Sequence, residues 1–274
     1  MFINTSWIKF QLDINYVNRI IKLLLDNSSE EYTKKQIADE INLAIPKTEA
    51  FIYWSRYLGL INRRNYTLTD FGKIYQDLWK LDKDTIYEIL YYRCIIFNKT
   101  VNYLVNDILY YTSKKYPSEF NNEDIENFFK DKYKELNFEN LNNLQKTSNL
   151  YLNSMINEAG FGYLGILEKT VNANFYVKKH LPSWKGAFYI LVMNSVLLNV
   201  NQANLIISTN NIIEGRNNLG RIFMLQKDDV SFIIDELVTK YLLKREKVST
   251  FDQIYIRNEI LNEKELIEVL IHND

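Results

Sequence analysis

The stretch of sequence that decides the fold runs from residue 58 to residue 73 and reads LGLINRRNYTLTDFGK. Gly59 follows a helical pattern, and glycine readily adopts the left-handed conformation that ends many helices. Two short β-capable segments then flank the polar turn 62–67, and residues 69–73 begin another helix. The stretch therefore predicts a helix, a short β-hairpin and a second helix.

Two further helices are predicted on the N-terminal side of this stretch. Residues 14–26 place apolar side chains at helical spacing. Thr33 and Gln36 have the spacing of a capping box, which predicts a second helix, and Pro46 suits the first turn of a third. The order helix, helix, helix, hairpin, helix is that of a winged-helix domain, which we predict over residues 1–82.

The middle of the chain shows the same order of elements again. The pattern predicts helices near 84–97, 100–113 and 141–158, a loop over 117–121, an acidic-started helix from Asn122, and β-capable segments at 163–168 and 174–178. We therefore predict a second helical and winged-helix domain over residues 83–182.

The last region, residues 183–274, is predicted to be an α-rich region. Helices are expected near 184–199, 228–240 and 263–271, with an apolar strand at 238–243. The predicted fold is mainly α with short β-hairpin wings, as tandem winged-helix units followed by a C-terminal helical region.

Composition predicts a globular protein of the cytoplasm. The 274 residues are 47% hydrophobic and 24% charged, and 3 Pro and 8 Gly leave little room for long irregular linkers. Cys94 is the lone cysteine and lies in an apolar stretch, which favours a buried thiol in a reducing compartment. The N-terminus lacks the pattern of a signal peptide, and no uncharged apolar run reaches the roughly 18 residues of a membrane span.

Catalytic patterns are sparse. His180 and His272 are the only histidines, so a Ser/His/Asp triad would have to use His180, and a His/Cys zinc site lacks ligands. Asp124, Asp131 and Glu135 have the spacing of a solvated helix face, unlike a magnesium site. No Gly-rich phosphate loop is present in the sequence. We expect a protein without enzymatic activity, cofactor or metal.

The net charge of −1 argues against a protein that coats nucleic acid by bulk electrostatics. Nucleic-acid binding would therefore depend on local basic surfaces. In a winged helix the third helix commonly enters the major groove and the hairpin contacts the DNA backbone. Polar or basic residues off the inferred apolar face of the third helix, and in the hairpin turn, are the predicted DNA contacts of the first unit: Lys47, Thr48, Tyr53, Arg56, Arg63 and Arg64.

The second unit carries lysines around its predicted hairpin. Between residues 163 and 186 four lysines face one acid, Glu168, which predicts a basic wing. Thr147 and Ser148 offer short polar side chains near the start of the preceding helix. The predicted DNA contacts of this unit are Lys146, Lys169, Lys178 and Lys179.

Several segments resemble families encoded in bacterial phage-defence islands. The segments NEDIENFF, KTSNL and MINEAG, within residues 122–160, resemble the BrxA family of BREX systems, which are small DNA-binding proteins. The segments YWSRYLGLI (53–61), LTDFG (68–72) and LGRIFML (219–225) are similar to an uncharacterised family found beside phosphorothioate-dependent restriction genes. These resemblances imply a DNA-binding accessory role in phage defence.

We therefore predict a non-enzymatic protein that binds duplex DNA, mainly through phosphates, with no membrane partner. The first alternative is a scaffold that contacts other subunits of a defence or restriction complex, which mixed charge and many aromatic residues also fit. The second is the recognition part of a nuclease.

Overall fold

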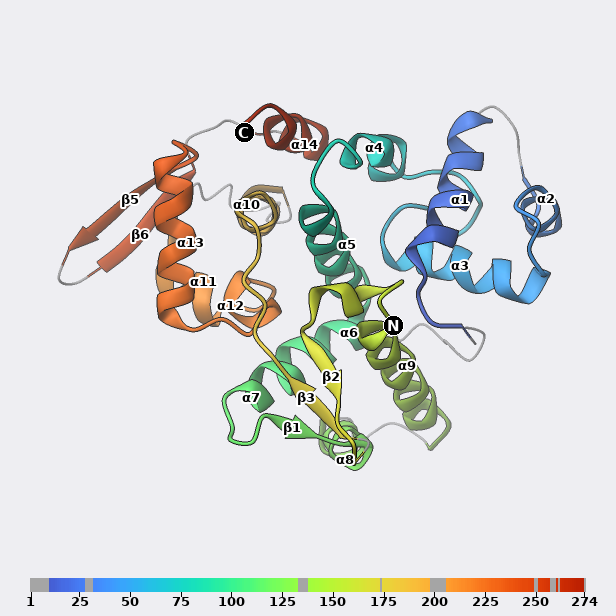
Figure 1. Cartoon of the computed structure of the whole chain (residues 1–274), viewed down its shortest axis with the longest axis horizontal. Helices are drawn as coiled ribbons and strands as arrows, with labels where there is room; N and C mark the ends of the chain where they lie inside the picture. The colour runs from blue at the N-terminus through green and yellow to red at the C-terminus, as the bar shows by residue number, and fades with distance from the viewer. Residues whose placement is uncertain are drawn as a thin grey trace. The chain divides into compact units, whose positions relative to one another are not determined.

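The chain is mainly helical and carries two small three-stranded antiparallel sheets (Figure 1). The computed structural model describes residues 10–27, 32–132, 138–172, 174–197, 206–248, 251–256, 260 and 262–273. Contacts divide the chain into two compact units. Unit 1 consists of residues 1–76 and 93–178, and unit 2 of residues 77–92 and 179–274. The helix α5 (Lys83–Phe97) therefore contributes residues to both units.

Unit 1 begins with four helices, and an isolated β-bridge between Ile61 and Leu68 lies between the third and the fourth. The helices are α1 (Ile14–Asp26), α2 (Lys34–Glu40), α3 (Ile45–Tyr57) and α4 (Asp70–Leu78), whose last residues belong to unit 2. The capping box predicted for α2 is confirmed, because Thr33 and Gln36 each accept a hydrogen bond from the other's backbone. The predicted hairpin is reduced to one bridge.

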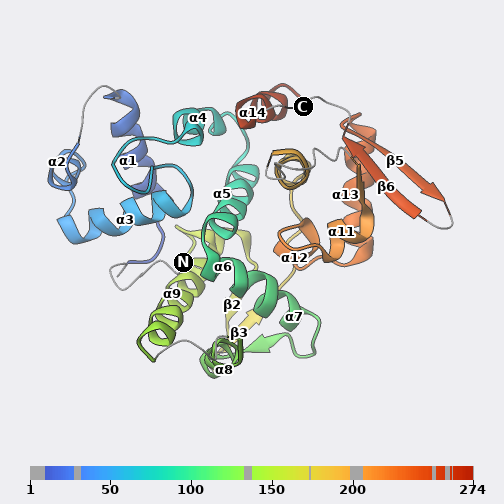
Figure 2. The same ribbon diagram turned by 180° about the vertical axis from the view of Figure 1, so that it is seen from behind.

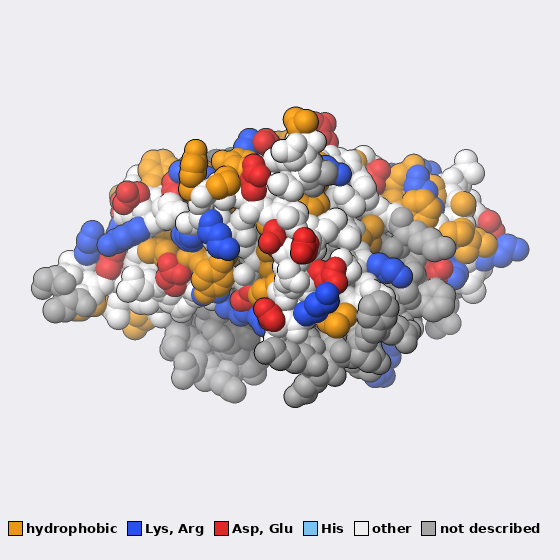
Figure 3. Space-filling view, turned by 90° about the horizontal axis from the view of Figure 1, so that it is seen from below, with side chains coloured by type: hydrophobic (Ala, Val, Ile, Leu, Met, Phe, Trp, Pro, Cys, Tyr) orange, Lys and Arg blue, Asp and Glu red, His pale blue; other side chains and the backbone are white. Residues whose placement is uncertain are grey.

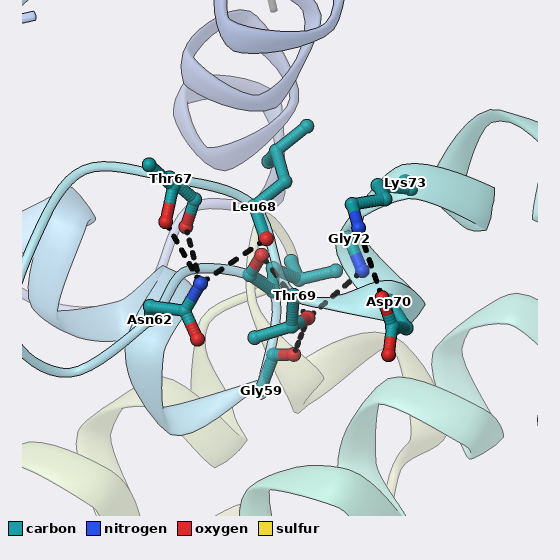
Figure 4. A network of polar contacts seen from close by, with 9 residues as sticks. Gly59, Asn62, Thr67, Leu68, Thr69, Asp70, Gly72 and Lys73 are labelled. Carbon is teal, nitrogen blue, oxygen red and sulfur yellow. Dashed lines mark hydrogen bonds and ion pairs between the residues drawn. The ribbon is translucent and has the colours of Figure 1, made fainter. Parts of the chain in front are cut away.

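A network of side-chain hydrogen bonds holds the turn after α3 (Figure 4). Asn62 Nδ2 donates to Thr67 Oγ1 at 2.8 Å across the turn. Thr69 Oγ1 donates to the carbonyl of Gly59 at 2.5 Å and accepts from the amide of Gly72 at 3.0 Å. One hydroxyl thus joins the end of α3 to the first turn of α4.

Two glycines are required in this stretch for different reasons. Gly59 has φ +71°, so the predicted left-handed residue after α3 is confirmed. Gly72 has no such backbone angle, but a Cβ there would lie 2.1 Å from the carbonyl oxygen of Leu60. The helix α4 can therefore approach Leu60 this closely only because residue 72 is a glycine.

A buried arginine completes this corner of unit 1. Arg93, on α5, is only 2% exposed. Its Nε donates to the carbonyl of Leu58 at 2.9 Å, and its guanidinium carbon lies 3.4 Å from the centre of the Phe71 ring. The last carbonyls of α3 have no partner within the helix, so the arginine supplies donors that the helix itself lacks.

The rest of unit 1 contains the first sheet and the helices beside it. The helical segments are α6 (Lys99–Tyr103), the π-helix η1 (Leu104–Leu109), α7 (Tyr110–Ser113), α8 (Asn122–Lys132), α9 (Phe138–Ile156) and the 3₁₀ helix η2 (Phe161–Leu164). The strands are β1 (Glu119–Phe120), β2 (Leu167–Lys169) and β3 (Phe175–Val177), in the order β1-β3-β2.

Two predictions in this region are corrected. The segment 117–121 was expected to be a loop but contains β1, because Phe120 pairs with Phe175 and their rings stack with centroids 5.2 Å apart. That pairing joins residues far apart in the chain, so local pattern does not reveal it. The β-capable segment 163–168 begins within η2, and its strand starts only at Leu167.

The N-terminal segment joins the first helices to α9 within unit 1. The amide of Leu12 donates to Ser154 Oγ at 2.9 Å, and the amide of Ile14 donates to the carbonyl of Ala159 at 2.8 Å. Contacts thus group most of the first two predicted regions, residues 1–82 and 83–182, in one unit.

Unit 2 contains the second sheet, packed against α13. Its helical segments after residue 179 are α10 (Trp184–Val192), the π-helix η3 (Met193–Leu197), α11 (Thr209–Glu214), α12 (Leu219–Ile222), α13 (Lys227–Thr239) and α14 (Glu263–His272). The strands are β4 (Ile206–Ser208), β5 (Leu243–Val248) and β6 (Phe251–Ile256), in the order β4-β6-β5. Both ribbon views place α13 along β5 and β6 (Figures 1 and 2).

The strand predicted over 238–243 is corrected, because α13 continues to Thr239 and β5 starts at Leu243. Tyr241 has φ +59° and ends the helix. Glycine or asparagine usually occupies such a position, so a tyrosine there gives no sequence signal for the helix end.

The expectation of a buried thiol is confirmed, since Cys94 is fully buried on α5 and burial raises its pKa far above the usual range. Among the helices of the described ranges, none has the length and apolar character to cross a membrane.

We expect Gly72→Ala to destabilise the protein by about 1–3 kcal/mol, because the new methyl group meets a backbone carbonyl. Gly165→Ala is the control: Gly165 has φ +63° but nothing within 4 Å of a Cβ, so it should cost about 1 kcal/mol for the backbone angle alone. Urea unfolding measures both, and a cost at Gly72 no larger than at Gly165 would contradict the packing of α4 against Leu60.

Candidate nucleic-acid interface

The third helix buries one of the residues predicted to face DNA. Thr48 is 0% exposed, so its prediction as a DNA contact is wrong. Thr48, Phe51 and Ser55 share one helix face by their spacing, and that face is buried. Thr48 and Ser55 satisfy their hydroxyls by donating to carbonyls four residues earlier, at 3.2 and 2.8 Å. Small hydroxyl residues are therefore part of the packed face of α3.

Arg56 holds the turn 62–67 against α3. Its Nε donates to the carbonyl of Asn62 at 3.2 Å and its Nη2 to that of Asn65 at 3.4 Å. The guanidinium carbon also lies 5.5 Å from the ring centres of Tyr53 and of Tyr66. Arg56 and Tyr53, both predicted DNA contacts, lie beside each other on α3, and Arg56 uses its donors to hold the turn.

Lys47 is half-buried against α1. Its Nζ lies 3.1 Å from the hydroxyl of Tyr16 and 4.2 Å from the centre of that ring. A phosphate would therefore compete with an existing cation–π contact for this amine.

The two arginines of the turn are exposed. Arg63 Nη2 makes a long hydrogen bond of 3.4 Å to the carbonyl of Phe97. Arg64 makes no hydrogen bond or ion pair with any described residue. The structure therefore leaves the Arg64 guanidinium available to an external anion.

On α9, Lys146 is exposed and has no ion-pair partner in the described ranges. Its neighbours Thr147 and Ser148 are 6% and 1% exposed, so the expectation that their side chains meet DNA is wrong. Each hydroxyl donates to a carbonyl four residues earlier, at 2.8 and 2.9 Å. In α9, as in α3, small hydroxyl residues therefore lie on the buried face of the helix.

The predicted basic wing keeps one unpaired lysine. Lys169, on β2, is exposed and has no partner among the described residues. Lys178 forms an ion pair with Glu168, and Lys179 lies in unit 2, where its Nζ is 2.7 Å from Asp229. Counting charges along the sequence overestimated the basic character of this wing because it omitted the distant Asp229.

Sequence reasoning missed three exposed lysines of unit 1. Lys22 on α1, Lys35 on α2 and Lys115 after α7 are exposed and make no ion pair with the described part of the chain. For Lys22 and Lys35, a position opposite the apolar residues of a predicted helix was a usable signal. Figure 3 shows basic and acidic side chains interspersed on one face.

The only histidine that a triad would use lies in a structural network of unit 2. His180 Nε2 is 2.9 Å from Oε1 of Glu88, which is 0% exposed. Ser183 Oγ donates to Oε2 of the same carboxylate at 2.6 Å and accepts from the amide of Gly186 at 3.0 Å. Ser183 thus hydrogen-bonds to the Glu88 carboxylate and caps α10. A catalytic serine would instead hydrogen-bond to the imidazole of His180.

Asp124 and Asp131, which were considered as possible magnesium ligands, are exposed on α8. Glu135, the third acidic residue of that set, lies outside the described residues. Within the described part of the chain, no group of three or more His, Cys, Asp or Glu side chains is arranged to hold a metal ion.

Comparison with known proteins gives a likeness of fold. No protein-family model matches the sequence, and no curated protein matches it. The fold resembles that of SspB. An SspB crystal structure aligns with a TM-score of 0.67 at 12% identity, and a magnesium ion-bound SspB structure aligns with 0.66 at 11%. Each alignment covers 96% of this chain and 84% of that chain.

We expect Arg56→Gln to release the turn while unit 1 stays folded. Loss of two hydrogen bonds and two ring contacts should speed amide exchange over residues 62–67 by about tenfold. Arg64→Gln is the matched control, since it removes the same charge from a side chain that has no partner among the described residues. Mass-spectrometric hydrogen exchange measures both, and equal effects would show that Arg56 does not hold the turn.

Proposed function

We propose that this protein binds duplex DNA through unit 1, with winged-helix-type elements that contact phosphates, as an accessory without catalytic activity of its own. The observation that carries the proposal is a set of exposed cations on unit 1 whose side chains make no hydrogen bond or ion pair with a described residue: Lys22, Lys35, Arg64, Lys115, Lys146 and Lys169. An exposed cation without a partner is available to neutralise a phosphate and release a counterion.

The order of elements supports the proposal. Three helices, a bridged turn and a fourth helix follow one another in residues 14–78, and Arg64 lies at the turn, where a wing would contact the DNA backbone. A helix followed by two short antiparallel strands recurs at α9, β2 and β3, with Lys146 on the helix and Lys169 on a strand. Tandem winged-helix units are the interpretation that these two orders favour.

We expect the protein to bind DNA mainly through its phosphates and less through the edges of its bases. Three short hydroxyl side chains that sequence analysis offered to DNA, Thr48, Thr147 and Ser148, are buried. The cations that remain are lysines and arginines suited to phosphate oxygens. Binding should therefore be weakly dependent on sequence and strongly dependent on salt. The resemblance to BrxA-type proteins favours a role in bacterial phage defence.

Exposed aromatic residues on unit 2 favour a second candidate function, that of a scaffold that contacts another protein of a defence complex. Phe232 on α13 is 60% exposed and Tyr241, just after it, is 76% exposed. Aromatic residues are enriched at protein interfaces. This candidate concerns a different unit and is compatible with DNA binding by unit 1.

We expect the triple variant Arg64→Gln, Lys146→Gln and Lys169→Gln to weaken binding to a labelled duplex of arbitrary sequence. The slope of log K against log salt should fall by up to about 0.9 for each phosphate contact removed. Fluorescence anisotropy across a salt series, without added metal, measures both quantities.

The control variant carries the same change of net charge in unit 2, as Lys240→Gln, Lys244→Gln and Lys264→Gln. It should keep the slope of the parent protein. If the parent protein does not bind duplex even at low salt, or if both triple variants lower the slope equally, DNA binding by unit 1 is rejected and the scaffold candidate is preferred.

A further inference from the structure

The turn between β2 and β3 in unit 1 presents a hydrophobic side chain to solvent. Val171 lies in this turn and is fully exposed, as is Tyr116 in the loop before β1, whereas the other exposed large hydrophobic side chains of the described residues are partly covered. Turns favour glycine, proline, asparagine, aspartate and serine, and β-branched residues favour the packed surface of a strand. Neither turn geometry nor packing therefore accounts for a valine at this position.

The base of this turn is held in place by the first sheet. The amide of Thr170 donates to the carbonyl of Asn174 at 2.8 Å, which closes the turn. Directly after it, Phe175 on β3 pairs with Phe120 on β1, and the two buried rings stack with centroids 5.2 Å apart. The hairpin thus presents Val171 from a packed base, and the valine side chain itself has few accessible rotamers because it is branched at Cβ.

The charge beside the turn is positive. Lys169, the last residue of β2, is exposed and makes no ion pair with a described residue. The neighbouring acid Glu168 is neutralised by Lys178. Glu123 and Asp124, at the start of α8, follow β1, which the order β1-β3-β2 places two strands from Lys169. Two strand spacings are about 10 Å, a distance over which salt largely screens exposed charges.

The spacing of the lysine and the valine matches the minor groove of DNA. Two residues of extended chain span at most about 7 Å, and the minor groove is about 6 Å wide. A hairpin with Val171 over the groove therefore brings Lys169 within reach of a phosphate that borders it. Proteins that bind this groove often insert a hydrophobic side chain between base pairs, which partly unstacks the bases and bends the duplex.

We propose that this hairpin inserts Val171 between base pairs from the minor groove, while Lys169 contacts a phosphate at the edge of the groove. The inference rests on the proposed duplex binding by unit 1 and adds a preference for DNA that bends or opens easily. Unstacking a base step costs free energy, and the cost is lower where pairing is already weakened. The protein thus recognises the deformability of the duplex, which is compatible with few contacts to base edges.

Fluorescence anisotropy of the full chain with two duplexes of the same length tests the proposal. One duplex is fully paired, and the other differs only by a single central mismatch. We expect the mismatched duplex to bind about three- to tenfold more tightly. Val171→Ser should bring this ratio of affinities close to one, and the salt slope should stay that of the parent protein because Lys169 is retained. Val171→Leu, with a longer hydrophobic side chain, should not lower the ratio.

Val248→Ser is the matched control, since Val248 is an exposed valine at the end of β5 in unit 2, and it should leave the ratio unchanged. Equal affinity of the parent protein for the two duplexes, or a preference that Val171→Ser leaves intact, would overturn this inference while duplex binding by unit 1 stands. Absence of binding to either duplex would reject the proposed function and this inference together, so the two failures are distinguishable.

Discussion

The buried cation of Arg93 is the interaction on which the first part of unit 1 depends. A guanidinium that is 2% exposed is costly unless its donors are used, and here it donates to the carbonyls of Leu58 and Gly59 and lies over the Phe71 ring. The arginine thereby ties the C-terminal end of α3 to α4 and α5. Loss of these bonds would leave carbonyls without donors at the point where the chain reverses direction.

The turn 62–67, which carries the proposed DNA contact Arg64, is positioned by the packing around Arg93. Thr69 and Gly72 bring α4 against the residues after α3, and Arg56 holds the turn 62–67 on the other side. Arginines within a few residues of one another thus have opposite roles: Arg56 is used internally, while Arg64 has no partner among the described residues. The proposal rests on that difference in partners, which net charge alone does not reveal.

Local patterns predicted much of the fold and less of the candidate site. The capping box at Thr33, the left-handed Gly59 and the order of elements around the turn were predictable because each depends on neighbours in sequence. The partner of Lys179 and the burial of Thr48 depend on tertiary packing, and the helix end at Tyr241 has an unusual residue for its backbone angle. Hydroxyl residues look exposed in a sequence, but bonds to carbonyls four residues earlier let them pack inside.

The most direct measurement of the central claim is hydrogen exchange of the full chain with and without a saturating short duplex at low salt. Binding through unit 1 predicts slower exchange over residues 62–67, around Lys146 on α9 and along β2, with unit 2 unchanged. Protection confined to unit 2, or no protection anywhere at concentrations where anisotropy reports a complex, would contradict the account.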